Sequence, residues 1–185
     1  QYQRENAWTW EHMALTRARV LFGSADARAQ VDAIVADVLH RQRDPEKLRV
    51  DIASMRKDMA AHKPPKGDLD VKLLPGGLVD MEFIIHRLQL ETHDGLMPQL
   101  GPAIDTLVEA GHLPADFATA YALFARLLVM VRLVAPDCAT PPLAAQALIA
   151  GSLGFADWDG LVTAIRDYRG VVTDEWQRLF GPRDF

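Results

Sequence analysis

The chain has 185 residues, of which 49% are hydrophobic, enough for one domain or a tight pair of subdomains. Its formal net charge of −5 argues against the broad basic face that nucleic-acid binding needs. The single cysteine, Cys138, excludes a disulfide framework and a multi-cysteine metal site. Because the N-terminus lacks the basic-then-apolar pattern of a signal peptide, we expect a soluble, cytoplasmic protein.

Capping residues divide the first third of the chain into predicted helices. Gly23 suits the left-handed position that ends a helix, and Ser24 is a natural N-cap for the next one. Asp44 followed by Pro45 forms a second pair of this kind, a cap and a first-turn proline. We therefore predict helices over residues 3–22, 24–42 and 44–62.

A proline- and glycine-rich break over residues 63–67 follows, and residues 68–74 are expected to form a short strand or extended arm. The break is the best boundary in the chain. The three helices before it would have little core of their own, so we predict a single helical domain over residues 1–185.

Five more helices are predicted in the rest of the chain. They are expected over residues 78–93 and 102–111, from Pro114, from Pro141 and Pro142, and after Asp157. The helix from Pro114 is apolar on nearly all sides, which favours the centre of a bundle. Arg126 and Arg132 interrupt it, so we do not expect it to span a membrane. The predicted fold is an all-α bundle of about seven or eight helices with an extended arm near 68–74.

The segment after the break combines a lysine, a glycine turn and an acidic helix start. Lys72 precedes the turn at Gly76 and Gly77, and Asp80 and Glu82 follow near the start of the helix. Such a group can bind a phosphate, with backbone N–H groups of the turn completing the cradle. The alternative is structural: an acid stabilised by the helix dipole after an ordinary turn. At roughly 100° per residue the two acids lie about 200° apart, so they are not a paired-carboxylate site.

Metal and nucleophile signatures are weak. Asp68 and Asp70 alternate like the metal-binding pair of nucleotidyl-transfer enzymes, but two aspartates alone do not make a two-metal site. The histidines show no zinc-ligand spacing on a shared face, and no serine or cysteine nucleophile motif is present. We therefore predict no catalytic residue and no metal ligand in this chain.

The first predicted helix mixes tryptophan and arginine on both of its faces. Its two stripes are Trp8, His12, Leu15 and Arg19, and Trp10, Arg17 and Leu21. Either the arginines lie along the tryptophans and extend their charged ends into water, or one of them faces a neighbouring active site or an anionic ligand. The two interpretations stay open. His12 alone is interpreted as a structural histidine.

Three segments, in order, resemble the bacterial glutamine synthetase adenylyltransferase family. The family has a Trp-Glu-x-x-Ala-Leu-x-(Arg/Lys)-Ala-Arg helix, a Met-Arg-x-x-Met helix and an Asp-(Ile/Leu)-Lys-x-x-x-Gly-Gly-x-x-Asp-Ile-Glu-Phe segment. The corresponding stretches here are Trp8–Arg19, Met55–Met59 and Asp70–Phe83. The motifs cover roughly the first half of the chain. Position 86 is His, where the family commonly has glutamine.

The resemblance implies a helical domain that follows a nucleotidyltransferase core in a bifunctional enzyme. One half of such an enzyme transfers AMP from ATP to a tyrosine of glutamine synthetase, and the other removes it by phosphorolysis. The tryptophan motif resembles the adenylylating C-terminal half, and an end at Phe185 without a further domain agrees with that. The catalytic core, with its metal-binding aspartates, is expected upstream of Gln1. The related uridylyltransferases share this type of helical domain.

The resemblance also implies site residues and partners. The side facing the nucleotide site of the core would contain Lys72, Gly76, Gly77, Asp80, Glu82, Arg17 and Arg19. ATP and Mg²⁺ would act in the full-length enzyme, and the partners would be the upstream core, glutamine synthetase and a PII-type signal protein, without nucleic acid or membrane. We expect the chain to support AMP transfer but to be inactive alone. The alternative is a non-catalytic helical adaptor, a regulatory or protein-binding module.

Overall fold

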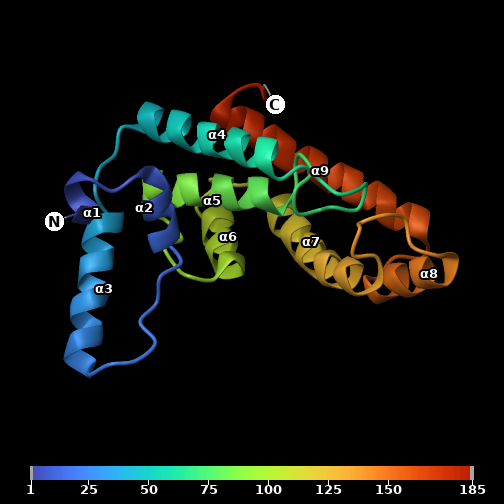
Figure 1. The fold of residues 1–185 in the computed structure, drawn as a ribbon, viewed down its shortest axis with the longest axis horizontal. Helices are drawn as coiled ribbons and strands as arrows, with labels where there is room; N and C mark the ends of the chain where they lie inside the picture. Colours follow the sequence, from blue (N-terminus) through green and yellow to red (C-terminus); the bar gives the residue numbers. More distant parts are fainter. Residues whose placement is uncertain (1, 184–185) are drawn as a thin grey trace.

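The computed structural model describes residues 2–183, apart from the side chain of residue 4, and this part of the chain is helical without a strand (Figure 1). Its helices are α1 (Tyr2–Glu5), α2 (Thr9–Leu15), α3 (Ala25–Leu39), α4 (Pro45–His62), α5 (Leu78–Thr92), α6 (Leu100–Glu109), α7 (Ala115–Val134), α8 (Leu143–Ser152) and α9 (Trp158–Phe180). The prediction of an all-α fold is confirmed.

The predicted first helix is broken in two. Trp8 has extended backbone torsions, φ −80° and ψ 158°, and begins α2 after the single turn of α1. Its N–H donates to the Glu11 carboxylate at 2.8 Å, so the side chain three residues ahead supports the new helix start. α2 ends at Leu15, and the chain then runs through a loop to Gly23, where φ is +132°. The prediction of one helix over residues 3–22 is therefore wrong.

The predicted helix starts at Ser24, Asp44 and Asp157 are confirmed, and each of these side chains caps its helix. The hydroxyl of Ser24 accepts from the N–H of Ala27 at 3.2 Å and begins α3. The carboxylate of Asp44 accepts two N–H groups of the first turn of α4, at 2.9 and 3.1 Å. Asp157 accepts from Gly160 at 2.8 Å and begins α9. Each cap satisfies N–H groups that have no partner within the helix.

The centre of the fold is α5, which buries 12 of its 15 residues. It lies between α4 and α9 on one side and α2, α6 and α7 on the others (Figure 1). The expectation that the apolar helix from Pro114 is central is wrong. That helix, α7, packs against α5, α6, α8 and α9 on one side and leaves Val129 58% and Leu133 81% exposed. In the described residues it is the one helix long and apolar enough to cross a bilayer, a weak criterion that core helices of soluble proteins also meet.

The expected extended arm is instead a series of turns, which we call the glycine loop (residues 68–77). The Asp70 N–H donates to the carbonyl of Gly67 at 3.0 Å, and the Leu74 N–H donates to the carbonyl of Asp70 at 3.0 Å. The Asp70 carboxylate accepts the N–H groups of Lys66 and Leu73 at 3.0 and 3.1 Å. The alternating aspartates thus mark a turn, because a carboxylate that accepts nearby N–H groups competes with strand pairing.

Candidate functional site

The glycine loop closes back onto the N-terminus of α5. The N–H of Leu78 donates to the carbonyl of Val71 at 2.8 Å, and the N–H of Val79 donates to the carbonyl of Lys72 at 3.1 Å. Gly77 also donates its N–H within the loop, at 2.9 Å. These N–H groups therefore already have acceptors in the chain, and they do not form the open phosphate cradle that the sequence allowed.

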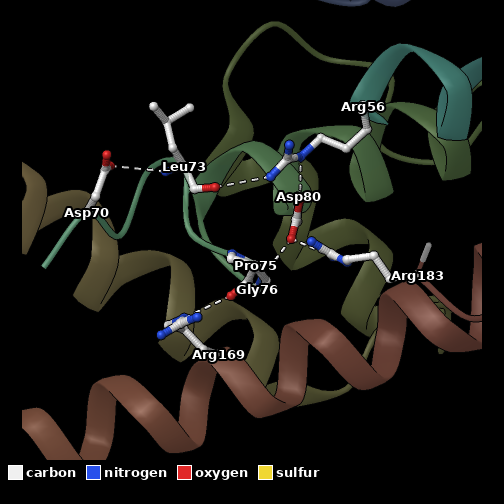
Figure 2. Close-up of polar contacts among 8 residues, drawn as sticks. All are labelled: Arg56, Asp70, Leu73, Pro75, Gly76, Asp80, Arg169 and Arg183. Atoms are coloured by element: carbon white, nitrogen blue, oxygen red, sulfur yellow. Dashed lines mark hydrogen bonds and ion pairs between the residues drawn. The ribbon is translucent and has the colours of Figure 1, made fainter. Parts of the chain in front are cut away.

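Asp80 lies at the centre of a buried ion-pair network (Figure 2). Its Oδ1 accepts from Nε of Arg56, and its Oδ2 accepts from Nη2 of Arg183, each at 2.6 Å. Oδ2 also accepts the N–H of Gly76 at 2.6 Å. The side chains of Asp80 and Arg56 are 0% and 2% exposed. Asp80 therefore does more than stabilise the first turn of α5. Its carboxylate links α4, the glycine loop and the segment after α9.

Two arginines also bind backbone carbonyls of the glycine loop. Nη2 of Arg56 donates to the carbonyl of Leu73 at 3.2 Å, and Nε of Arg169, on α9, donates to the carbonyl of Pro75 at 2.8 Å (Figure 2). Gly76 has a φ of +77°, and a Cβ there would lie 2.3 Å from the carbonyl oxygen of Arg169. Glycine is required at this position both by the left-handed torsion and by the close approach of α9.

Glu82 faces the opposite side of α5. Its carboxylate lies 3.7 Å from Nη1 of Arg17, and the two side chains are 35% and 51% exposed. Burial is the largest cause that raises the pKa of the nearby Tyr121, and the charge of Glu82 raises that pKa further. Asp80 and Glu82 therefore have different charged partners. An exposed ion pair of this kind contributes little to stability, about 0–1 kcal/mol.

The seven residues of the predicted site thus separate into two groups. Gly76, Gly77 and Asp80 are buried and shape the loop, whereas Lys72, Arg17 and Arg19 are exposed and Glu82 is half-buried. The structure brings Lys72 onto the same loop as the two glycines, and Arg17 to Glu82. The nucleotide-facing role of the seven residues stays a prediction.

Sequence reasoning missed a second polar contact of α5, at His86. The His86 Nδ1 lies 3.0 Å from the hydroxyl of Thr16 and 3.1 Å from Oε1 of Gln89, and the Gln89 amide donates to the carbonyl of Gly95 at 2.6 Å. Burial lowers the pKa of His86 to about 4, an effect to which the charge of Arg17 adds and which the Gln89 bond opposes. This contact connects the end of α2 to the central helix. His12, as interpreted from the sequence, has a structural bond, with Nε2 2.9 Å from the carbonyl of Gln3.

A divalent metal ion is not accommodated by the described residues. They contain no group of three histidine, cysteine or acidic side chains placed to hold an ion. Asp70 and Asp80 are buried, and their carboxylates accept the N–H groups described above, while Asp68 is exposed. We therefore assign no Mg²⁺ ligand among residues 2–183.

A cavity of about 460 Å³ lies away from the glycine loop, between α1, α2 and the start of α4. Its lining includes Trp8, His12, Arg41, Lys47 and Asp51. Asp51 is engaged there, because its carboxylate accepts from Nζ of Lys47 at 2.7 Å and from a threonine of α2. This cavity therefore belongs to the tryptophan segment and not to the loop that carries Lys72.

Comparison with known proteins shows which proteins the chain resembles. A sequence model of the family described as glutamate-ammonia ligase adenylyltransferase matches residues 1–34. A protein of Brucella suis biovar 1 named bifunctional glutamine synthetase adenylyltransferase/adenylyl-removing enzyme is 33% identical over 190 residues, covering 97% of this chain and 19% of the relative. Proteins of the same name are 39% identical over 138 residues in Mesorhizobium japonicum (71% of this chain, 14% of the relative) and 51% identical over 89 residues in Rhizobium meliloti (48% and 9%).

The chain is homologous to one segment of the glutamine synthetase adenylyltransferases. The resemblance inferred from three motifs is confirmed, and it extends beyond the first half of the chain. The chain spans about a fifth of the length of the Brucella relative, 19%.

The three adenylyltransferase motifs meet in the fold. Arg56, from the Met-Arg motif on α4, pairs with Asp80 of the glycine motif. Arg17, from the tryptophan motif, lies beside Glu82 of the same glycine motif. The first and second motifs therefore each contribute an arginine to the third, on opposite sides of α5. The arginine of the second motif therefore helps to fix the glycine loop through Asp80, whereas the exposed arginine of the first motif lies beside the first turns of α5.

Proposed function

We propose that the chain is the helical domain of a glutamine synthetase adenylyltransferase, which supports transfer of AMP from ATP to a tyrosine of glutamine synthetase and is inactive alone. Homology over 97% of the chain to proteins with this printed name supports the assignment. The observation that carries it is the glycine loop, held from inside by Asp80 and Arg56 so that Lys72 lies on its exposed side.

The geometry suits a supporting role at a nucleotide site. Lys72 is a flexible point charge, but its backbone is fixed because its carbonyl accepts from Val79 on α5. A cation on a rigid backbone can be placed near a phosphate with little loss of entropy on binding. In this proposal Lys72 faces the nucleotide bound by the upstream core, and the exposed Arg17, Arg19 and Glu82 face the core or the protein substrate.

The remaining parts of the proposal concern the whole enzyme. ATP and Mg²⁺ act in the full-length protein, with the metal held by the upstream nucleotidyltransferase core. The partners are that core, glutamine synthetase and a PII-type signal protein, and the protein is cytoplasmic. One hydrophobic cluster runs from α2 to α9, which supports a single domain over residues 1–185.

The test uses unmodified glutamine synthetase, ATP and Mg²⁺. We expect the 185-residue chain alone to incorporate no AMP, and incorporation would overturn the proposal that it is inactive alone. In the full-length enzyme, Lys72→Ala should lower kcat/KM for ATP by about tenfold or more, the loss of roughly 1.4 kcal/mol of transition-state stabilisation. Lys63→Ala is the matched control, because Lys63 is an exposed lysine at the end of α4. It should change kcat/KM less than about twofold.

A non-catalytic adaptor is the second candidate, favoured by apolar side chains at the surface. Trp8 and Trp10 are 70% and 55% exposed, and Leu133 and Leu143 are each 81% exposed. Exposed apolar side chains that form one contiguous patch are typical of protein-binding faces. An unchanged transfer rate in correctly folded Lys72→Ala enzyme would favour the adaptor, with a glycine loop that is purely structural.

A further inference from the structure

Arg169 presents an unused hydrogen-bonding edge beside the glycine loop. Its Nε donates to the carbonyl of Pro75 at 2.8 Å, which fixes one edge of the guanidinium group (Figure 2). Within residues 2–183, no group accepts a hydrogen bond from its Nη1 or Nη2. Neither nitrogen is among the buried polar atoms that lack a partner. The two donors therefore face accessible space.

The backbone that carries this guanidinium is closely packed. A Cβ at Gly76 would lie 2.3 Å from the carbonyl oxygen of Arg169 and 2.8 Å from the hydroxyl of Thr173, one turn further along α9. The loop and α9 are thus in backbone contact at Gly76. Arg169 is positioned by this contact and by its bond to Pro75, so its open edge has a defined place on the outer side of the turn.

The charge of Arg169 is not balanced by Asp80, the carboxylate whose charge acts on it. Burial is the largest cause that lowers the pKa of Arg169; the charge of Asp80 raises that pKa and the charge of Arg183 lowers it. Asp80, however, already pairs with Arg56 and Arg183 at 2.6 Å each. One carboxylate therefore serves three guanidinium groups, and the half-buried cation of Arg169 would be stabilised by an added anion.

We propose that Arg169 binds a phosphate-type oxyanion at the outer edge of the Pro75–Gly76 turn, through Nη1 and Nη2. The planar fork of a guanidinium group matches two oxygens of a phosphate, and bidentate pairs of this kind are among the stronger hydrogen bonds in proteins. Lys72, on the same loop, supplies a second exposed positive charge. This inference deepens the proposed function, and it rests on that function only for the source of the phosphate, a nucleotide.

The test titrates the 185-residue chain with inorganic phosphate and, separately, with ATP, and follows the arginine side-chain resonances by NMR. We expect saturable shifts at Arg169 and none at Arg166, an exposed arginine on the same helix. Arg169→Lys keeps the charge but not the fork and should weaken binding by about fivefold or more, whereas Arg166→Gln should change it less than twofold. Circular dichroism confirms that each variant is folded.

Unshifted Arg169 resonances, or equal affinities of the wild type and Arg169→Lys, would overturn the inference. Tighter binding of ATP than of phosphate would assign the site to a nucleotide, and equal binding would assign it to free phosphate; either supports the phosphate-type site. The two proposals fail separately. Phosphate binding at Arg169 in a parent enzyme that transfers no AMP would contradict only the proposed function, and AMP transfer with unshifted Arg169 resonances would contradict only this inference.

Discussion

Asp80 shows how one residue can organise a segment that looks like a ligand site. It is 0% exposed and contacts two arginines and the N–H of Gly76. A buried carboxylate costs free energy to desolvate, and this cost is offset only while its partners are present. The residue that the sequence marks as a candidate for nucleotide contact therefore acts on the site through the shape of the glycine loop.

Asp80→Asn should destabilise the fold strongly. The substitution leaves Arg56 and Arg183 without their shared negative charge, and breaking a buried pair costs about 3–5 kcal/mol. Urea unfolding followed by circular dichroism measures the change in the free energy of unfolding. Asp68→Asn, at an exposed position of the same segment, serves as the control and should stay within about 0.5 kcal/mol of the wild type. Equal effects of the two substitutions would contradict the structural role of Asp80.

His86 should make the stability depend on pH. Its pKa is about 4 in the folded protein against a usual 6.5, so between these values the unfolded state binds more protons. The contribution of His86 is therefore complete above about pH 6.5 and is lost as the pH falls toward 4. From this shift we expect the free energy of unfolding to be about 2 kcal/mol lower at pH 5 than at pH 7.5. His86→Gln should remove most of this difference in urea titrations, and an unchanged difference would assign it to other groups.

At the scale of elements, helix caps could be predicted from the sequence, whereas the break before α2 and the turns around Asp70 could not. Ser24, Asp44 and Asp157 cap helices as predicted, because a cap needs only the next few residues. The break before α2 escaped prediction, since the helical pattern continues through Trp8 and only Glu11 marks the new start. The turns around Asp70 were missed for a similar reason, as alternating residues also fit a strand.

The candidate site was predictable in composition but not in geometry. The motif containing Lys72 and Asp80 could be singled out from the sequence. The partners of Asp80, however, are 24 and 103 residues away, at Arg56 and Arg183. No spacing rule connects residues so far apart, because their contact depends on how α4, α5 and α9 pack. Arg169 escaped notice because nothing in the local sequence of α9 indicates a contact with Pro75.

Two glycines with the same backbone torsion make it possible to distinguish the cost of a left-handed torsion from the cost of a steric collision. Gly76 and Gly111 both have a φ of +77°, but a Cβ at Gly111 meets nothing within 4 Å. Gly111→Ala should therefore cost only the left-handed torsion, about 1–2 kcal/mol. Gly76→Ala adds a collision with the backbone of Arg169 and should cost about 1–3 kcal/mol more. Thermal or urea unfolding of both variants measures the difference, and equal costs would contradict the close contact of the loop with α9.

At the scale of the whole molecule, burial is uneven. α5 is enclosed by its neighbours, whereas α3 projects from the body and buries only Val38 and Leu39 (Figure 1). Val31 and Ile34, further out on α3, are 44% and 59% exposed. Helices of this length are marginal in water without tertiary contacts. The stability of the fold therefore decreases from its centre toward α3.

Hydrogen exchange should show this gradient directly. We expect amides in the outer part of α3, residues 29–36, to open locally at a cost of only about 1 kcal/mol, because few contacts hold them. Amides at the centre of α5, around Ile84 and Ile85, should exchange only by global unfolding, since both side chains are 0% exposed. Mass spectrometry of exchanged peptides provides the measurement. Equal protection of the two helices would contradict the arrangement described above.

The pairing of Arg183 with Asp80 also determines how early during synthesis the glycine loop can reach its final structure. The two residues are separated by 103 positions, so a ribosome has translated Gly76, Asp80 and Arg56 long before Arg183 is made. Ribosomes add about 5–20 residues per second, and a domain generally folds as a unit. For several seconds, therefore, the nascent chain holds Asp80 with only one of its two arginines. The glycine loop therefore acquires its contact with Arg183 only at the end of synthesis. A polypeptide that stalls before Arg183 would expose an incompletely held loop to chaperones and proteases.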